Sequence, residues 1–224
     1  MKYLKNTFAK ALILFAAVLV FASCKKDKVG PDPAAEPFDI RQYVLVTKEL
    51  NSSGWVNNIR LTSFEAQSKC IIFTELGVIP DNGYTYGYDN GVLKLHYDLG
   101  LQYELKIEDK IITSNVSRRS FKLIKIPAEN SLNGNTYAGG WKSEGSLLTT
   151  IASLKFTDTH YSEASINLPA PNKTYELFKN IAAYKYDATD KVASLLLVLD
   201  GKLEGYRSFY NNNGNRVTGT FTKQ

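Results

Sequence analysis

The sequence predicts an all-β protein whose antiparallel strands form a meander barrel or a sandwich. From residue 38 onward, short runs rich in Val, Ile, Leu, Thr, Tyr and Phe recur at intervals of about 8 to 12 residues, with turn residues between them. Helical periodicity is nearly absent. Asn-Gly and Asp-Gly pairs join several of the runs, and such pairs favour tight hairpins. Because parallel sheets need long crossover connections, usually helices, the strands are expected to pair antiparallel.

The N-terminal segment, residues 1–23, has the pattern of a cleaved signal peptide. Lysines at positions 2, 5 and 10 precede an unbroken apolar stretch at residues 11–22. At about 1.5 Å per residue, a helix of this length reaches only about 18 Å, whereas the hydrocarbon core of a bilayer is about 30 Å thick. The segment is therefore predicted to be a targeting signal that is removed, rather than a membrane span.

Cys24 directly follows this segment in a setting that predicts lipidation. Phe21-Ala22-Ser23-Cys24 resembles a bacterial lipobox, in which the cysteine becomes the lipidated first residue of the mature protein. The following Lys25-Lys26-Asp27-Lys28 resembles the signal that sends lipoproteins of the Bacteroidota to the cell surface. The resemblance implies an outer-membrane lipoprotein that faces the periplasm or, as the favoured location, the cell surface. The alternative is an ordinary secretory signal followed by an unmodified Cys24.

Residues 24–37 are predicted to form a disordered tether between the lipid and a folded body. The segment is polar, contains prolines at positions 31, 33 and 37, and offers almost nothing to bury. Removal of the signal takes away three lysines and lowers the formal net charge from +5 to +2. A nearly neutral body lacks the basic face that binding to phosphate backbones needs, so no nucleic-acid partner is expected.

The folded body is expected to divide into two tandem β units, residues 38–127 and 128–224. Each half contains extended runs for roughly seven or eight strands, and a short echo links the halves, because Tyr86-Gly87-Tyr88-Asp89 recurs as Tyr184-Lys185-Tyr186-Asp187. One larger sandwich is the alternative, since all-β domains of this size are common. The clearest hairpin turns are predicted at Asn90-Gly91, at Asp200-Gly201 and across residues 211–215.

The second half carries a family resemblance. Residues 132–141, Leu-Asn-Gly-Asn-Thr-Tyr-Ala-Gly-Gly-Trp, are followed by Leu154-Lys155-Phe156-Thr157-Asp158-Thr159. Together they resemble the opening of small lipocalin-like domains of Bacteroidota lipoproteins. The resemblance implies an up-and-down meander that binds a small apolar or amphipathic ligand. Strands that average about six residues are nevertheless expected to fill the interior of such a barrel with their own side chains.

No catalytic or metal-binding pattern is found, so the protein is predicted to be a non-enzyme that uses no cofactor and no metal. The two histidines, His96 and His160, belong to no known catalytic or metal-ligand spacing. Cys70 lies in the apolar run 69–73 and is predicted to be a buried strand residue. Four carboxylates are interpreted as outward-facing strand or turn residues: Glu65, Glu75, Glu104 and Glu108.

Aromatic residues are the best candidates for ligand binding. Tyr84, Tyr86 and Tyr88 alternate along one strand, so their rings project from one face, a geometry that suits stacking on sugar rings. The alternative is that these rings pack across strands or cover a core. Trp55, in the turn-like sequence 51–55, is expected to be exposed and is the best single candidate for a binding contact, whereas Trp141 is expected in the core.

Two functions follow as hypotheses. The first is a lipid-anchored envelope protein that acts as a non-enzymatic binding module for a glycan or a small amphipathic ligand. It predicts an exposed aromatic cluster or an open barrel mouth. The second is a structural or accessory lipoprotein that binds a protein partner in an envelope complex and takes no small-molecule ligand. It predicts filled interiors together with an exposed apolar patch or an unpaired sheet edge.

Overall fold

The computed structural model of the chain describes residues 38–79, 84–96, 102–210 and 215–224. The predicted signal peptide, Cys24 and the predicted tether lie outside the described residues. From Asp39 to Gln224 the chain forms one compact unit.

The described chain is almost entirely β, which confirms the predicted fold class. No α-helix occurs among the described residues, where the only helical turns are two three-residue 3-10 helices, η1 (Ile40–Gln42) and η2 (Ala66–Ser68). The strands are β1 (Tyr43–Leu50), β2 (Val56–Phe64), β3 (Cys70–Thr74), β4 (Gly77–Ile79), β5 (Thr85–Asp89), β6 (Val92–His96), β7 (Gln102–Glu108), β8 (Ile111–Thr113), β9 (Arg119–Lys125), β10 (Thr136–Ser143), β11 (Thr149–Phe156), β12 (His160–Ala164), β13 (Lys173–Thr174), β14 (Glu176–Phe178), β15 (Ala182–Asp187), β16 (Val192–Leu199), β17 (Lys202–Phe209) and β18 (Asn215–Lys223).

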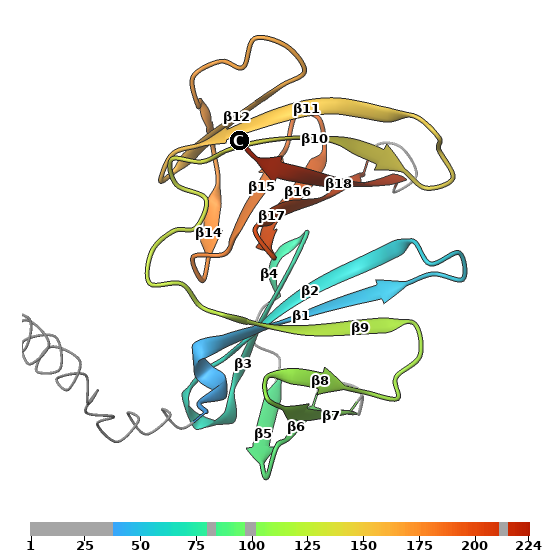
Figure 1. The fold of residues 1–224 in the computed structure, drawn as a ribbon, viewed down its shortest axis with the longest axis vertical. Coiled ribbons are helices and arrows are strands. Elements are labelled where there is room, and N and C mark those ends of the chain that lie inside the picture. The colour runs from blue at the N-terminus through green and yellow to red at the C-terminus, as the bar shows by residue number, and fades with distance from the viewer. Residues whose placement is uncertain (1–37, 80–83, 97–101, 211–214) are drawn as a thin grey trace, which may run out of the picture. The chain divides into compact units, whose positions relative to one another are not determined.

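The strands from β10 to β18 form one nine-stranded antiparallel sheet that curls into a nearly closed barrel (Figure 1). The strand order is β13-β12-β11-β10-β18-β17-β16-β15-β14, so every neighbour is consecutive in the chain except where β18 pairs with β10. The two edge strands, β13 and β14, are separated in the chain by Tyr175 alone. This is an up-and-down meander whose single opening lies between β13 and β14.

The strands from β1 to β9 follow the same plan in two sheets. A five-stranded sheet has the order β4-β3-β2-β1-β9, and a four-stranded sheet has the order β5-β6-β7-β8. Here too the pairs are consecutive, except that the last strand, β9, returns to pair with the first, β1. No strand before residue 127 is hydrogen-bonded to a strand after it in the described sheets.

Each half is closed by the pairing of its first strand with its last, β1 with β9 and β10 with β18, and these two seams have matching registers. Tyr43 at the start of β1 lies opposite Lys125 at the end of β9, and Tyr137 near the start of β10 lies opposite Lys223 at the end of β18. In each seam one more hydrogen bond follows the last strand pair. The Ile126 amide donates to the Gln42 carbonyl at 2.8 Å, and the Gln224 amide donates to the Thr136 carbonyl at 2.9 Å. Gln42 and Thr136 directly precede Tyr43 and Tyr137. The two halves therefore close by the same hydrogen-bonding scheme.

Side chains fill the interior of the β10–β18 barrel, as its short strands predict. Trp141 is 6% exposed, and its ring meets the ring of Phe221 edge to face at 5.2 Å between centroids. Around them lie further buried residues of the same cluster: Leu132, Tyr137, Ala152, Leu154, Phe156, Tyr161, Ala183, Leu196 and Leu203. Trp141 therefore belongs to the core, as predicted, and this part of the interior is occupied by protein.

A second hydrophobic cluster joins the two halves. Val44, Val46 and Leu61 from β1 and β2 pack in it together with Leu195 and Leu197 from β16. Because strand residues alternate between the two faces of a sheet, these residues define one face of each sheet. Among the described strands no pairing crosses the predicted boundary, but this hydrophobic cluster contains residues from both halves. The division into two domains therefore stays a prediction.

Two predicted hairpin turns have the backbone that their sequences favour. Asn90 and Gly91, between β5 and β6, have φ values of 48° and 77°, and Asp200 and Gly201, between β16 and β17, have φ values of 52° and 73°. Positive φ at both central residues is the hallmark of the tight turn that Asn-Gly and Asp-Gly favour. The third predicted turn falls mainly outside the described residues, but the strands on its two sides, β17 and β18, pair antiparallel.

Candidate functional site

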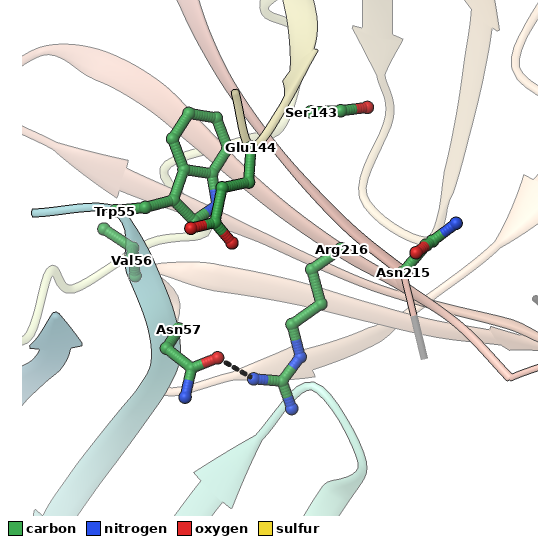
Figure 2. A pocket seen from close by; sticks show the side chains of 7 residues that line it. All are labelled: Trp55, Val56, Asn57, Ser143, Glu144, Asn215 and Arg216. Carbon is green, nitrogen blue, oxygen red and sulfur yellow. Dashed lines mark hydrogen bonds between the residues drawn. The ribbon is translucent and has the colours of Figure 1, made fainter. Parts of the chain in front are cut away.

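A polar cleft of about 410 Å³ contains Trp55, the best single candidate from the sequence (Figure 2). We call it the Trp55 cleft. Its volume lies within the range of about 300–1,000 Å³ that is usual for small-molecule sites. The cleft is built from three chain segments that are distant in sequence, and its lining residues are Trp55, Val56, Asn57, Ser143, Glu144, Asn215 and Arg216.

Asn51 closes the loop that presents Trp55. The side-chain Oδ1 of Asn51 accepts hydrogen bonds from the backbone amides of Ser53 and Trp55, each at 3.0 Å. The backbone amide of Asn51 donates to the Trp55 carbonyl at 2.9 Å. Gly54 has a φ of 81°, a conformation that a residue with a Cβ rarely adopts. These bonds give the loop between β1 and β2 a defined shape, so Trp55 has a fixed place in the wall of the cleft.

The cleft forms where two equivalent hairpin loops meet. The β1–β2 loop occupies residues 51–55 and the β10–β11 loop occupies residues 144–148, so both contain five residues. Their first residues are in contact, because the side-chain Nδ2 of Asn51 donates to Glu144 Oε1. The same Glu144 oxygen accepts a hydrogen bond from the Ser53 hydroxyl at 3.1 Å. The Glu144 carboxylate therefore ties the loop of one half to the loop of the other.

Arg216, at the start of β18, supplies the positive charge of the cleft. Its Nη1 donates to Asn57 Oδ1 at 3.1 Å (Figure 2), and its Nη2 lies 3.4 Å from Glu75 Oε1. Glu75 is only 6% exposed, which corrects the expectation that it faces outward. A buried carboxylate is unfavourable without a cationic partner, and the fold supplies Arg216 for that purpose.

The Trp55 ring is half-buried rather than exposed, and its polar atom is unused. Nε1 is buried and has no hydrogen-bond partner among the described residues. The cleft therefore combines an aromatic ring, amide groups, a carboxylate and a guanidinium, which together can stack on a sugar ring and bond its hydroxyl groups.

Tyr84, Tyr86 and Tyr88 are half-buried, and the residues between them, Thr85 and Gly87, are exposed. Tyr86 and Tyr88 lie opposite Leu95 and Leu93 of β6, which are at most 1% exposed, so these rings share the face that covers the core. The Tyr86 ring contacts the Phe64 ring edge to face at 5.0 Å, and its hydroxyl donates to the Glu65 carbonyl at 3.0 Å. Burial raises the pKa of both Tyr86 and Tyr88.

The structure does not bring Trp55 and the tyrosine row together. Trp55 directly precedes β2, whereas Tyr86 contacts Phe64 and Glu65 at the far end of that strand. At about 3.3 Å per residue, the length of β2 separates the two places by roughly 25 Å. The four predicted ligand-binding residues therefore belong to two separate places, and only Trp55 lines a described cleft.

Another tyrosine pair is exposed. Tyr186 and Tyr210 are 48% and 44% exposed, and their rings meet edge to face at 6.4 Å between centroids. Their neighbours Tyr184 and Tyr206 are at most 9% exposed and belong to the core shared by the two halves. Of these four tyrosines of the second half, Tyr184 and Tyr206 therefore cover the core, whereas Tyr186 and Tyr210 face solvent.

A smaller pocket of about 170 Å³ lies at one end of the β10–β18 barrel. Arg207 lines this pocket and makes three contacts with described side chains. Its Nη2 donates to Glu163 Oε2 at 2.7 Å, and its Nε donates to Ser194 Oγ at 3.0 Å. Its guanidinium lies 4.0 Å from the centroid of the Trp141 ring. Glu163 also accepts from Trp141 Nε1 at 2.7 Å. The charge of Arg207 is thus matched by Glu163, and the network holds the core tryptophan in place.

The remaining candidates show no catalytic arrangement. Cys70 is 4% exposed on β3, as predicted, and burial raises the pKa of its thiol to about 12, so the reactive thiolate is scarce at neutral pH. The His160 ring contacts only the neighbouring Thr159 hydroxyl, at 2.8 Å, in the described hydrogen bonds. Within the described ranges no cluster of His, Cys, Asp or Glu could hold a metal ion. The described residues also contain no helix long and apolar enough to cross a membrane.

Comparisons with protein-family models, with curated proteins and with solved structures find no match for this chain. The lipocalin-like resemblance of the second half therefore rests on its sequence motifs alone. The up-and-down strand order that this resemblance implies is present in β10–β18.

Sequence reasoning missed most of the cleft. Asn57, Glu144 and Arg216 are ordinary polar residues in three separate segments, and no motif sets them apart. The equal length of the two hairpin loops is the one available signal, because it places Asn51 and Glu144 at equivalent positions. That equivalence becomes visible only once the strand boundaries are known.

Proposed function

We propose that this protein is a lipid-anchored, non-enzymatic envelope protein that binds a glycan in the Trp55 cleft. The observation that carries the proposal is the composition of the cleft, in which Trp55 stands beside Asn57, Glu144 and Arg216. Aromatic rings stack on the C–H faces of sugars, and planar amide, carboxylate and guanidinium groups bond their hydroxyl groups. The filled interior of the β10–β18 barrel makes the cleft a better candidate than a lipocalin-type cavity for a small ligand.

A glycan array probed with the mature chain, beginning at residue 24 and carrying Cys24→Ser so that no lipid is attached, tests the binding. We expect one class of glycan to bind and Trp55→Ala to weaken that binding at least tenfold, or by about 1.4 kcal/mol, because the stacking surface is lost. Tyr86→Ala is the matched control, since Tyr86 lies at the other end of β2. Equal binding by the unsubstituted chain and by Trp55→Ala would refute the proposed site.

The membrane anchor has its own test. We expect radiolabelled palmitate to enter the protein and Cys24→Ala to abolish both the labelling and the recovery of the protein with membranes. One acyl chain holds a protein weakly whereas several hold it firmly, since each buried CH₂ contributes about 0.8 kcal/mol. A Cys24→Ala variant that still fractionates with membranes would contradict the anchor.

A structural or accessory role is the second candidate, and two observations favour it. The barrel interior is filled. In addition, β4 is the last strand at one side of its described sheet, it carries the exposed Val78 (54%), and the exposed Leu76 (62%) directly precedes it. Exposed edge strands with apolar residues are places where another chain can pair. The glycan array separates the candidates, because a purely structural protein is expected to bind no glycan.

A further inference from the structure

The loop on the second side of the Trp55 cleft ends in two unusually exposed leucines. Leu147 is 95% exposed and Leu148 is 81% exposed, and Ile151, three residues further on β11, is 68% exposed. Contiguous exposed apolar surface often marks a site that binds a protein or a membrane, whereas single scattered apolar residues on a surface are normal. The two leucines form a short apolar tip on the β10–β11 hairpin.

The apolar tip must lie close to the cleft, because few residues separate them in the chain. Glu144 lines the cleft, and four peptide units separate it from Leu148, so their Cα atoms lie at most about 14 Å apart. The turn between them is closed by hydrogen bonds, since the Ser146 amide donates to the Ser143 carbonyl at 3.1 Å and the Leu148 amide donates to Ser146 Oγ at 3.0 Å. Glu144 also binds Asn51 and Ser53, so the base of the loop is held in place.

Two adjacent leucines on a narrow tip suit an acyl layer better than a protein partner. A stable protein interface covers about 800 Å² on each side, far more than two leucine side chains supply. One basic residue lies beside the tip, because Lys142 on β10 is exposed and pairs with Thr149, the residue that follows Leu148. Basic side chains near the membrane surface are attracted by anionic headgroups.

We propose that the ligand of the Trp55 cleft is a membrane glycolipid, whose sugar headgroup occupies the cleft while Leu147 and Leu148 enter the acyl layer beside it. This inference rests on the proposed glycan binding and adds the second half of the ligand. A sugar site and an apolar tip within about 14 Å of each other match the way in which a glycolipid joins a polar headgroup to its acyl chains. The proposed outer-membrane location supplies such lipids.

The test uses the mature chain with Cys24→Ser and compares two forms of one ligand. The probes are phosphatidylethanolamine–phosphatidylglycerol vesicles that contain rough lipopolysaccharide, and the soluble core oligosaccharide released from the same lipopolysaccharide. We expect the double variant Leu147→Ser/Leu148→Ser to bind the vesicles with at least tenfold lower affinity, since burial of one leucine raises affinity roughly tenfold or more. Its affinity for the soluble oligosaccharide is expected to stay unchanged. Ile166→Ser is the matched control, because Ile166 is also exposed, at 78%, in a different loop.

The outcomes distinguish this inference from the proposed glycan binding. Vesicle binding that survives Leu147→Ser/Leu148→Ser, or that is equally strong to vesicles without lipopolysaccharide, overturns the glycolipid proposal. Trp55→Ala is expected to weaken binding of both probes, and soluble binding that is unaffected by Trp55→Ala would instead refute the cleft as a glycan site. Because Leu147 and Leu148 are exposed, thermal unfolding of the double variant is expected to match that of the unsubstituted chain.

Discussion

Replacement of Trp141 with alanine is expected to lower the free energy of unfolding by about 3–5 kcal/mol, the usual cost of removing a large buried aromatic side chain. The indole contacts Phe221, lies under the Arg207 guanidinium and donates to Glu163. The substitution therefore opens a cavity and also takes one hydrogen-bond donor from a carboxylate that is 14% exposed. Urea-induced unfolding, monitored by circular dichroism, measures the change in stability.

Trp55→Ala is the matched control, because Trp55 is the only other tryptophan in the chain. Its ring is half-buried at the edge of an open cleft, so its removal is expected to cost no more than about 1 kcal/mol. Equal destabilisation by the two substitutions would contradict the assignment of Trp141 to the core and Trp55 to a site.

Replacement of Gly139 with alanine is expected to destabilise the protein by at least about 2 kcal/mol, because it forces apart the seam that closes the β10–β18 barrel. A Cβ at this position would lie 2.1 Å from the Thr220 carbonyl oxygen and 2.7 Å from the Phe221 Cα. Both are backbone atoms of β18, so no side-chain rotation relieves the overlap. Thermal and urea unfolding of the variant measure the loss.

Gly87→Ala provides the comparison for this effect. Gly87 also lies within a strand, β5, but a Cβ there would meet no atom within 4 Å, and its φ is not in the left-handed range. The substitution is expected to leave stability unchanged or to raise it by about 0.4–1 kcal/mol, because alanine restricts the unfolded chain. A Gly139→Ala variant as stable as Gly87→Ala would show that β18 does not close on β10 as described.

Short-range features of the chain could be predicted because they depend on neighbouring residues. Asn90-Gly91 and Asp200-Gly201 adopt the positive φ that their residue types favour, and the alternating apolar runs become strands. Cys70 is buried because its run is apolar over several residues. Trp141 lies in the core, as predicted.

Long-range contacts could not be read in this way. The Trp55 cleft needs Asn57, Glu144 and Arg216 to meet across 159 residues of sequence, and Glu75 is buried because Arg216 comes from β18 to pair with it. No local pattern marks those residues, since ordinary polar side chains occur on any loop. The outward placement predicted for Glu75 was wrong for this reason.

The sequence by itself determined the class of the fold, the antiparallel pairing of neighbouring strands and the turns that join them, since these depend on residues close together in the chain. The tertiary structure alone decided that β9 returns to β1 and β18 to β10, that the halves share a core, and that two five-residue loops meet at Trp55. The physical reason is that distant segments meet through apolar burial, which is non-directional, so the pattern of apolar residues shows that a face is buried without naming the face that covers it.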